Sequence, residues 1–429
     1  MKLPIDKIRH YSGIVILALL PIAALFGNAP ADIALVLTVI LFLATSENVL
    51  QTLRQSRFMQ LSVIFWLWIL LCSAVSLFPK HSFQDSLPWI RFPLYAFALS
   101  IWLSAKYKIH RGAFLASAVI GSIIQFSVMG FQFISRRMAD DVIAGAAARL
   151  TGTFEKQMAG WYIIGVSLII VLEILQMIRE NRLTEKRRII GILFVGLTSL
   201  FMLMSGEMIN TLAFLGIVFL FFIFRRTNNI KNILPGLGGF SLILIVIVLF
   251  AWLDQGLHDR IVKAISHRLP WLPNSDYYPP LKAGYEFASQ NLLFGIGPKN
   301  TFNYCQTLKE QGLIDTIKLF NSNGCPWHPH NLYLQIATET GLVGLALFSS
   351  LVGYLLISAI AALKKVDGCN NIAIAILFIS LFPLQTYSQA FGQSRNFYLW
   401  TLLGFAISNI RSILEKSVPV NSNSRNVLK

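Results

Sequence analysis

The sequence predicts an all-α polytopic membrane protein with about twelve transmembrane helices and one large periplasmic loop between spans 9 and 10. Of its 429 residues, 55% are hydrophobic and only 13% are charged. A soluble chain would carry about 25% charged residues. The apolar residues also come in long blocks that approach the roughly 20 residues needed to cross a bilayer. Together these observations exclude a soluble protein and a disordered one.

Taken in order, the apolar blocks predict the spans. The first block could be a signal peptide, but eleven further blocks follow it, which favours a retained first helix. The predicted spans are residues 11–26, 31–44, 61–78, 92–104, 112–134, 161–177, 189–204, 211–224, 233–253, 332–362, 372–386 and 397–413.

The net charge of +16 indicates topology rather than a nucleic-acid partner. With the N-terminus inside, 22 of the 36 Lys and Arg residues fall on the inner side, mostly in short loops. Basic residues concentrate in cytoplasmic loops of membrane proteins. We therefore expect both termini to be cytoplasmic, membrane lipids to surround the protein, and no nucleic-acid partner.

The spans divide the chain into three regions. Residues 1–253 form an N-terminal transmembrane bundle of about nine spans, and residues 254–331 form the periplasmic loop region. Residues 332–429 hold spans 10–12 and a cytoplasmic tail. A long polar insertion among short hairpins typically carries function, so we expect the active site to face the periplasm.

Two of the four cysteines, Cys305 and Cys325, lie in the long loop. In an oxidising compartment they could form a disulfide, and two free thiols are the alternative. A metal site built from Cys325, His328 and His330 matches no common zinc spacing. We therefore expect neither a metal nor a cofactor.

The most informative stretch is Trp327-His328-Pro329-His330-Asn331, where the loop meets span 10. Pro329 suits a helix start. A continuous helix would place Gly341 and Gly344 within roughly 20° and 40° of His330, on a stripe that lets a neighbouring helix approach closely. Glu339 would lie on the opposite side of that helix. The alternative reading of His330 is a helix-capping residue without a chemical role.

His330-Asn331, nine residues, Gly341, two residues and Gly344 form a pattern that resembles the signature of the O-antigen ligase and polymerase superfamily. Upstream, Leu293-Phe294-Gly295-Ile296-Gly297-Pro298 resembles a Gly-x-Gly segment that members carry before this histidine. Twelve spans with one large late periplasmic loop also match the family.

The resemblance implies a metal-independent glycosyltransferase of the bacterial inner membrane that uses a polyprenyl-diphosphate-linked glycan as donor. The acceptor would be a sugar of lipid A-core or another glycan. A histidine with a pKa near neutral can accept the proton of the acceptor hydroxyl, so we expect His330 to be catalytic. Cationic side chains can stabilise the departing diphosphate, and the planar fork of arginine suits phosphate.

Basic residues at the outer membrane boundary are candidates for binding the diphosphate or the acceptor. Arg149 opens Arg-Leu-Thr-Gly-Thr-Phe, which resembles an arginine-glycine-phenylalanine segment of the superfamily, and Arg395 starts the last span. Headgroup contact or a loop salt bridge is the alternative, favoured for Lys299, Arg260 and Arg268. The predicted substrate-binding residues are Arg149, Arg395, Asn331, Arg268 and Lys282.

The sequence departs from the family pattern at two positions. Glu207 stands where ligases usually carry an arginine at the start of span 8, and Tyr277 falls near a second expected arginine. Lys282 or Arg268 could substitute for the second one. An ion pair with Arg149 or Arg395 is the structural reading of Glu207, and a general base is the functional one.

We therefore expect an O-antigen ligase-like glycosyltransferase. The alternatives are an O-antigen polymerase or protein O-glycosyltransferase of the same superfamily, and a transporter or flippase without covalent chemistry. A transporter would favour ionisable residues at the bilayer midplane. Apart from Glu173, the notable polar residues of this chain lie near the predicted outer face.

Overall fold

The computed structural model describes residues 5–138, 149–156, 158–223, 275, 277–316, 324–364, 371–383 and 390–416, with isolated positions between 241 and 252. Over these residues the chain is helical and forms no strand. The α-helices are α1 (Ile5–Ala23), α2 (Asn28–Thr45), α3 (Val49–Gln55), α4 (Arg57–Val75), α5 (Pro79–Ser86), α6 (Arg91–Trp102), α7 (Lys108–Met138), α8 (Ala159–Tyr162), α9 (Leu168–Arg179), α10 (Glu185–Met204), α11 (Met208–Ile223), α14 (Tyr278–Gln290), α15 (Thr301–Glu310), α17 (Leu332–Lys364), α18 (Ile372–Leu381) and α19 (Ser394–Lys416).

Eight helical segments in the described part of the chain are long and apolar enough to cross a membrane, and each corresponds to a predicted span. They are Arg9–Phe26, Asn28–Thr45, Arg57–Val75, Lys108–Ser135, Ala159–Arg179, Glu185–Met204, Leu332–Lys364 and Arg395–Glu415. The class of polytopic helical membrane protein is therefore confirmed.

The other four predicted spans do not correspond to helices long enough to cross a membrane by themselves among the described residues. Residues 211–224 and 372–386 correspond to the shorter helices α11 and α18, while 233–253 lies almost wholly outside the described residues. The segment 92–104 corresponds to α6, whose 12 residues continue a helical run that begins with α5 and the 3₁₀ turn Leu87–Ile90. The structure thus extends this helical segment backward into residues predicted as a loop.

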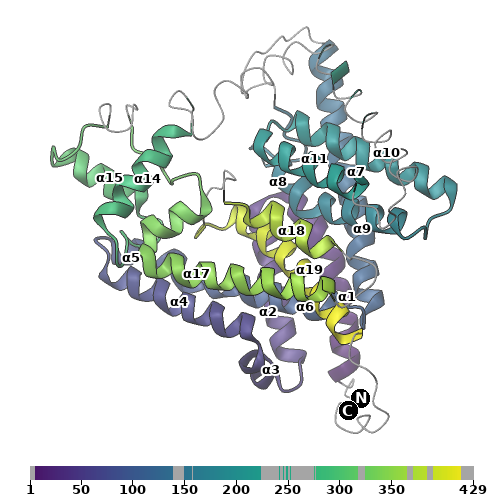
Figure 1. The fold of residues 1–429 in the computed structure, drawn as a ribbon, viewed down its shortest axis with the longest axis horizontal. Coiled ribbons are helices and arrows are strands. Elements are labelled where there is room, and N and C mark those ends of the chain that lie inside the picture. The colour runs from purple at the N-terminus through teal and green to yellow at the C-terminus, as the bar shows by residue number, and fades with distance from the viewer. Residues whose placement is uncertain are drawn as a thin grey trace.

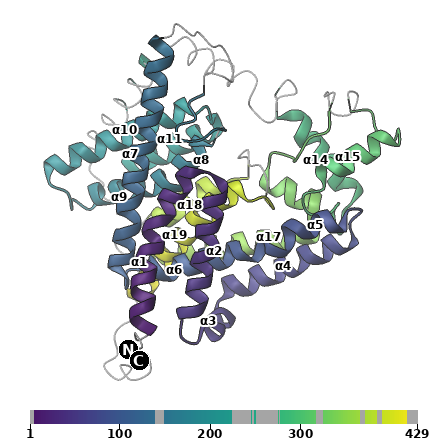
Figure 2. The same cartoon turned by 180° about the vertical axis from the view of Figure 1, so that it is seen from behind.

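The helices pack around α19 (Figure 1). α19 packs most extensively against α6 and also contacts α18, while α1 packs on α7 and α2. α4 and α17 run side by side toward α5, α14 and α15 at one end of the molecule, and α14 packs on α17 (Figures 1 and 2). Inside the bundle Glu173 pairs with Arg111, as expected of an acid kept away from lipid.

The helix α17 is broken at Gly341, which has φ 70° and ψ −176°. The condition of an unbroken helix from His330 is therefore not met, and His330 and the two glycines share no helical stripe. His330 lies before the helix with φ 55°. Gly344, in the second half of α17, still provides close approach: an added Cβ would stand 3.2 Å from Trp68 of α4.

The segment 292–297 replaces the hydrogen bonds that the break removes. The N–H groups of Ile296 and Gly297 donate to the carbonyls of Thr338 and Glu339, both at 3.0 Å. Beyond the break, the N–H of Leu342 donates to Leu292 at 2.8 Å. The indole N–H of Trp68 donates to the Thr340 carbonyl at 2.9 Å. Unpaired backbone groups are costly in an apolar environment, so these bonds stabilise the break.

Replacing Gly341 with Ala is expected to destabilise the protein by at least about 2 kcal/mol, because only glycine readily adopts this backbone conformation. The added Cβ would also meet the Leu293 carbonyl oxygen at 2.0 Å. Gly353→Ala is the matched control, since an added Cβ there meets nothing within 4 Å on the same helix. Thermal melts of the purified variants measure the effect, and equal melting temperatures would refute this account.

Candidate functional site

The turn that carries His330 is fixed on both sides. Cys325 forms a disulfide with Cys305 of α15, with a Cα–Cα distance of 5.7 Å. Trp327 stacks on Phe302 of the same helix at a centroid distance of 4.1 Å. The disulfide occupies the sulfur of Cys325, so the structure offers no thiolate beside the two histidines for a metal.

Pro329 packs on α14, where an added Cβ at Gly284 would meet the proline ring at 2.6 Å. Asn331 caps α17: its side-chain oxygen accepts from the N–H of Leu334 at 3.0 Å. Its side-chain nitrogen donates to the carbonyl of Pro383. Both ends of this amide are bonded within the protein, so Asn331 helps to position the turn, and its expected contact with substrate stays a prediction.

Three groups lie around the His330 ring. The His328 ring lies 4.3 Å away and the Tyr277 ring 5.4 Å away, between centroids. The third group is Arg395, which influences His330 electrostatically. Its guanidinium lies 4.6 Å from the centre of the Trp161 ring. We call His328, His330, Tyr277, Arg395 and Trp161 the His330 cluster.

The pKa of His330 falls from 6.5 to about 4, mainly because of burial, with the positive charge of Arg395 contributing in the same direction. Burial is also the main reason why the pKa of His328 falls to about 3, with His330 and Arg395 contributing. Both rings are therefore neutral at pH 7. Neither ring nitrogen of His328 has a hydrogen-bond partner among the described residues. A neutral imidazole beside a guanidinium can accept a proton while the cation attracts an anion.

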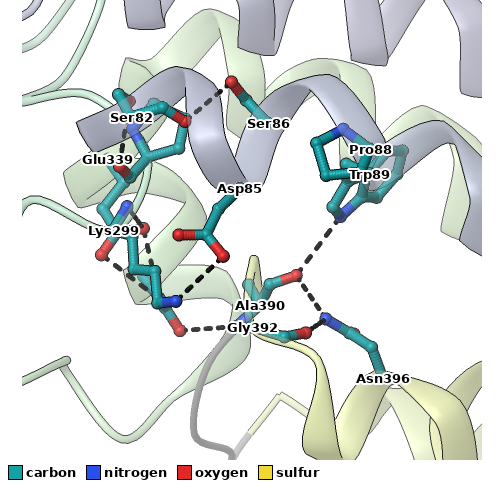
Figure 3. Close-up of polar contacts among 12 residues, drawn as sticks. Ser82, Asp85, Ser86, Pro88, Trp89, Lys299, Glu339, Ala390, Gly392 and Asn396 are labelled. Carbon is teal, nitrogen blue, oxygen red and sulfur yellow. Dashed lines mark hydrogen bonds and ion pairs between the residues drawn. The ribbon is translucent and has the colours of Figure 1, made fainter. Parts of the chain in front are cut away.

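A network of polar contacts links Lys299 and Glu339 to the segment 390–396 at the start of α19 (Figure 3). At its centre, the fully buried carboxylate of Glu339 accepts from the N–H of Lys299 at 2.7 Å and from the Thr301 hydroxyl at 2.8 Å. The amide of Gln335 donates to the same carboxylate at 3.2 Å. The side-chain oxygen of Gln335 accepts from the N–H of Ala390 at 2.8 Å.

The chain from Ala390 to Arg395 is held by the same network. The carbonyl of Ala390 accepts from Trp89 at 3.3 Å and from the amide of Asn396 at 2.9 Å. Asn396 also donates to the carbonyl of Gly392. Glu339 therefore positions the start of α19, and with it Arg395, through Gln335.

Arg149 lies next to the junction between α10 and α11. Its side chain packs on Gly206, where an added Cβ would meet Arg149 atoms at 2.7–2.8 Å. The neighbouring Glu207 packs on Gly160, the residue before Trp161, where an added Cβ would meet its Cγ at 2.5 Å. The segment after Arg149 is anchored by Gln132, whose side-chain oxygen accepts from the N–H of Gly152 at 2.9 Å. Arg149 therefore lies beside Gly206, next to residue 207, where the family pattern predicts an arginine.

The remaining candidates lie elsewhere or are not described. Lys282, on α14, places its ammonium 5.9 Å from the ring centre of Tyr278. Lys299 forms an ion pair with Asp85 at 2.9 Å, the kind of salt bridge expected of it. Arg260 and Arg268 lie outside the described residues. Gly295 and Gly297, at φ 67° and 88°, shape the segment that seals the break in α17.

Sequence reasoning missed the importance of Glu339 and of Trp161. A continuous helix places Glu339 on the side opposite His330, and that assumption conceals its contacts with residues 299–301. An acidic residue within an otherwise apolar span was the available signal. Nothing in the sequence distinguished Trp161 from the other eight tryptophans.

The general class is a polytopic helical membrane protein with a half-buried histidine that interacts electrostatically with Arg395. The sequence model of the O-antigen ligase family matches residues 192–349, a range that contains His330, Glu339 and both glycine pairs. Over these residues the chain thus resembles the O-antigen ligase family, whose members are membrane glycosyltransferases of the ligase or polymerase type. Arg149 and Arg395 lie outside the matched range. No curated protein matches the chain.

Removing the charge of Arg395 is expected to raise the pKa of His330 while leaving it below 6.5, because the burial remains. Histidine-selective ¹⁵N NMR of Arg395→Gln and wild type across pH 3–8 measures this. Arg54→Gln, which removes an exposed cation on α3, serves as the control. A wild-type His330 that titrates near 6.5, or that ignores the loss of Arg395, would contradict the geometry.

Glu339→Gln is expected to lower stability by about 1–3 kcal/mol, because an amide cannot accept from all three donors that face the carboxylate. Glu339→Ala should cost at least as much. Glu310→Gln, at the exposed end of α15, is the matched control. Thermal melts provide the measurement, and a Glu339→Gln protein as stable as wild type would exclude a central role for this carboxylate.

Proposed function

We propose that this protein is an O-antigen ligase-like glycosyltransferase acting at the periplasmic face of the inner membrane. It moves a glycan from a polyprenyl diphosphate to a sugar of lipid A-core. The observation that carries the proposal is the His330 cluster: a neutral, half-buried imidazole close enough to Arg395 to feel its charge. The match to the O-antigen ligase family over the segment that holds His330 supports it.

In the proposed reaction, the acceptor hydroxyl oxygen attacks the anomeric carbon of the donor sugar, on the face opposite the diphosphate. A new glycosidic bond forms, and the bond between the anomeric carbon and the phosphate oxygen breaks. His330 takes the hydroxyl proton, and polyprenyl diphosphate leaves with the electron pair of the broken bond. Attack on the opposite face inverts the anomeric configuration.

Arg395 and Arg149 have separate parts in this proposal. Arg395 contacts the departing diphosphate, where a guanidinium can form two hydrogen bonds with phosphate oxygens. The negative diphosphate would offset the effect of Arg395 on His330, raising the basicity of the imidazole when the donor is bound. Arg149, held beside Gly206, is the second proposed diphosphate contact.

Replacing His330 with Ala should reduce transfer at least about 100-fold, since a positioned general base contributes that much or more. The test is complementation of a host that lacks its own ligase, read as capped lipopolysaccharide on a gel. His81→Ala, on α5, controls for the loss of an imidazole, and membrane levels of each variant are compared by immunoblot. Undiminished capping by His330→Ala would refute its role.

The glycans that remain after deletion of the gene discriminate a ligase from a polymerase. Deletion in the native host should abolish all capping of lipid A-core with glycan, while polymerised glycan on the lipid carrier persists. Capping with single repeat units would instead indicate a polymerase, and loss of glycan from protein alone would indicate a protein O-glycosyltransferase. Purified protein that transfers glycan without added nucleotide or metal would exclude a transporter.

A further inference from the structure

A second polar site lies far from the His330 cluster. A half-open cavity of about 300 Å³ is enclosed by α4, α6, α17 and α19, and its polar lining comes from Ser56, Tyr354, Ser358, Arg411 and Glu415. Arg411 lies sixteen residues beyond Arg395 on α19, roughly 24 Å along the helix axis. None of the chemistry proposed above uses this cavity.

The cavity lies where three membrane spans end. α4 begins at Arg57, directly after Ser56, and Ser56 accepts a hydrogen bond from the N–H of Met59 as the helix cap. α17 ends at Lys364, two turns beyond Ser358, and α19 ends just after Glu415. Ends of spanning helices that carry basic residues lie at the level of lipid headgroups. The cavity is therefore at the depth of a headgroup.

Its charges suit one class of headgroup. The guanidinium of Arg411 lies 5.6 Å from the ring centre of Phe97, and Tyr354 and Glu415 interact with it electrostatically. Arginine binds phosphate through a planar pair of donors. Glu415, one turn further on and exposed, offers a carboxylate to a cation. A positive and a negative group one helical turn apart match a phosphate and an ammonium on one ligand.

We propose that this cavity binds the headgroup of a zwitterionic phospholipid that carries a primary ammonium, namely phosphatidylethanolamine. The phosphate pairs with Arg411, and the ammonium donates to the carboxylate of Glu415. The tails lie along the exposed apolar side chains of α17, which include Ile357 and Ile360, 71% and 48% exposed.

Two other common headgroups fit these charges less well. Phosphatidylglycerol offers a phosphate but no cation for Glu415, so the carboxylate repels it. Phosphatidylcholine carries a quaternary ammonium, which has no N–H to donate and is bulkier. The charge pair therefore predicts a preference for phosphatidylethanolamine over both lipids.

The test uses the full-length protein in detergent, titrated with each of the three lipids and analysed by native mass spectrometry. Wild type is expected to bind phosphatidylethanolamine at least about tenfold more tightly than the other two. Arg411→Gln should lose this binding at least about tenfold. Glu415→Gln should keep phosphate binding but lose the preference over phosphatidylglycerol. Arg57→Gln, which removes an exposed cation at the same membrane level outside the cavity lining, should bind as wild type does.

Equal binding of the three lipids by wild type, a preference for phosphatidylglycerol, or no binding at all would overturn the proposal. So would an Arg411→Gln protein that binds as wild type does. Should Arg411→Gln fail to fold, the loss of headgroup preference in Glu415→Gln decides the question. The readout is independent of transferase activity, so failure of the proposed reaction leaves it unaffected.

Discussion

The arrangement at one end of the molecule depends on the interruption of α17 at Gly341. A helix broken inside an apolar bundle leaves carbonyl and N–H groups without partners. The segment 292–297 and Trp68 supply those partners, so the loop region can dock in only one register. The same docking brings Lys299 and Thr301 to Glu339. The two glycine pairs that resemble the family signature, Gly295 with Gly297 and Gly341 with Gly344, therefore both belong to the junction between the segment 292–297 and α17.

The His330 cluster is assembled from segments far apart in the sequence. The histidines come from the turn before α17, Tyr277 from the start of α14, Trp161 from α8 and Arg395 from α19. No single segment holds a complete set of groups, so the cluster exists only when the bundle is assembled. The disulfide and the cap at Asn331 then limit how far the imidazole can move relative to Arg395.

Composition and block length predicted the class of fold and eight of the spans, because a bilayer imposes a length that the sequence must meet. The helical run from α5 to α6 was underestimated because Lys80, His81 and Asp85 interrupt its apolar pattern. Arg395 was expected beside His330, and the structure brings them close enough to interact. The break at Gly341 could not be foreseen, since a glycine in an apolar helix more often serves packing than interruption. Its partners lie some fifty residues upstream, where local periodicity carries no information about them.

The placement of Arg149 beside Gly206 bears on how such proteins are recognised in genomes. A search that demands an arginine in the column occupied by Glu207 would discard this chain, although a guanidinium from another helix junction reaches the same neighbourhood. A positive charge in this part of the molecule can therefore be supplied from residue 149 as well as from residue 207. A search pattern that accepts either position would retain sequences of both kinds.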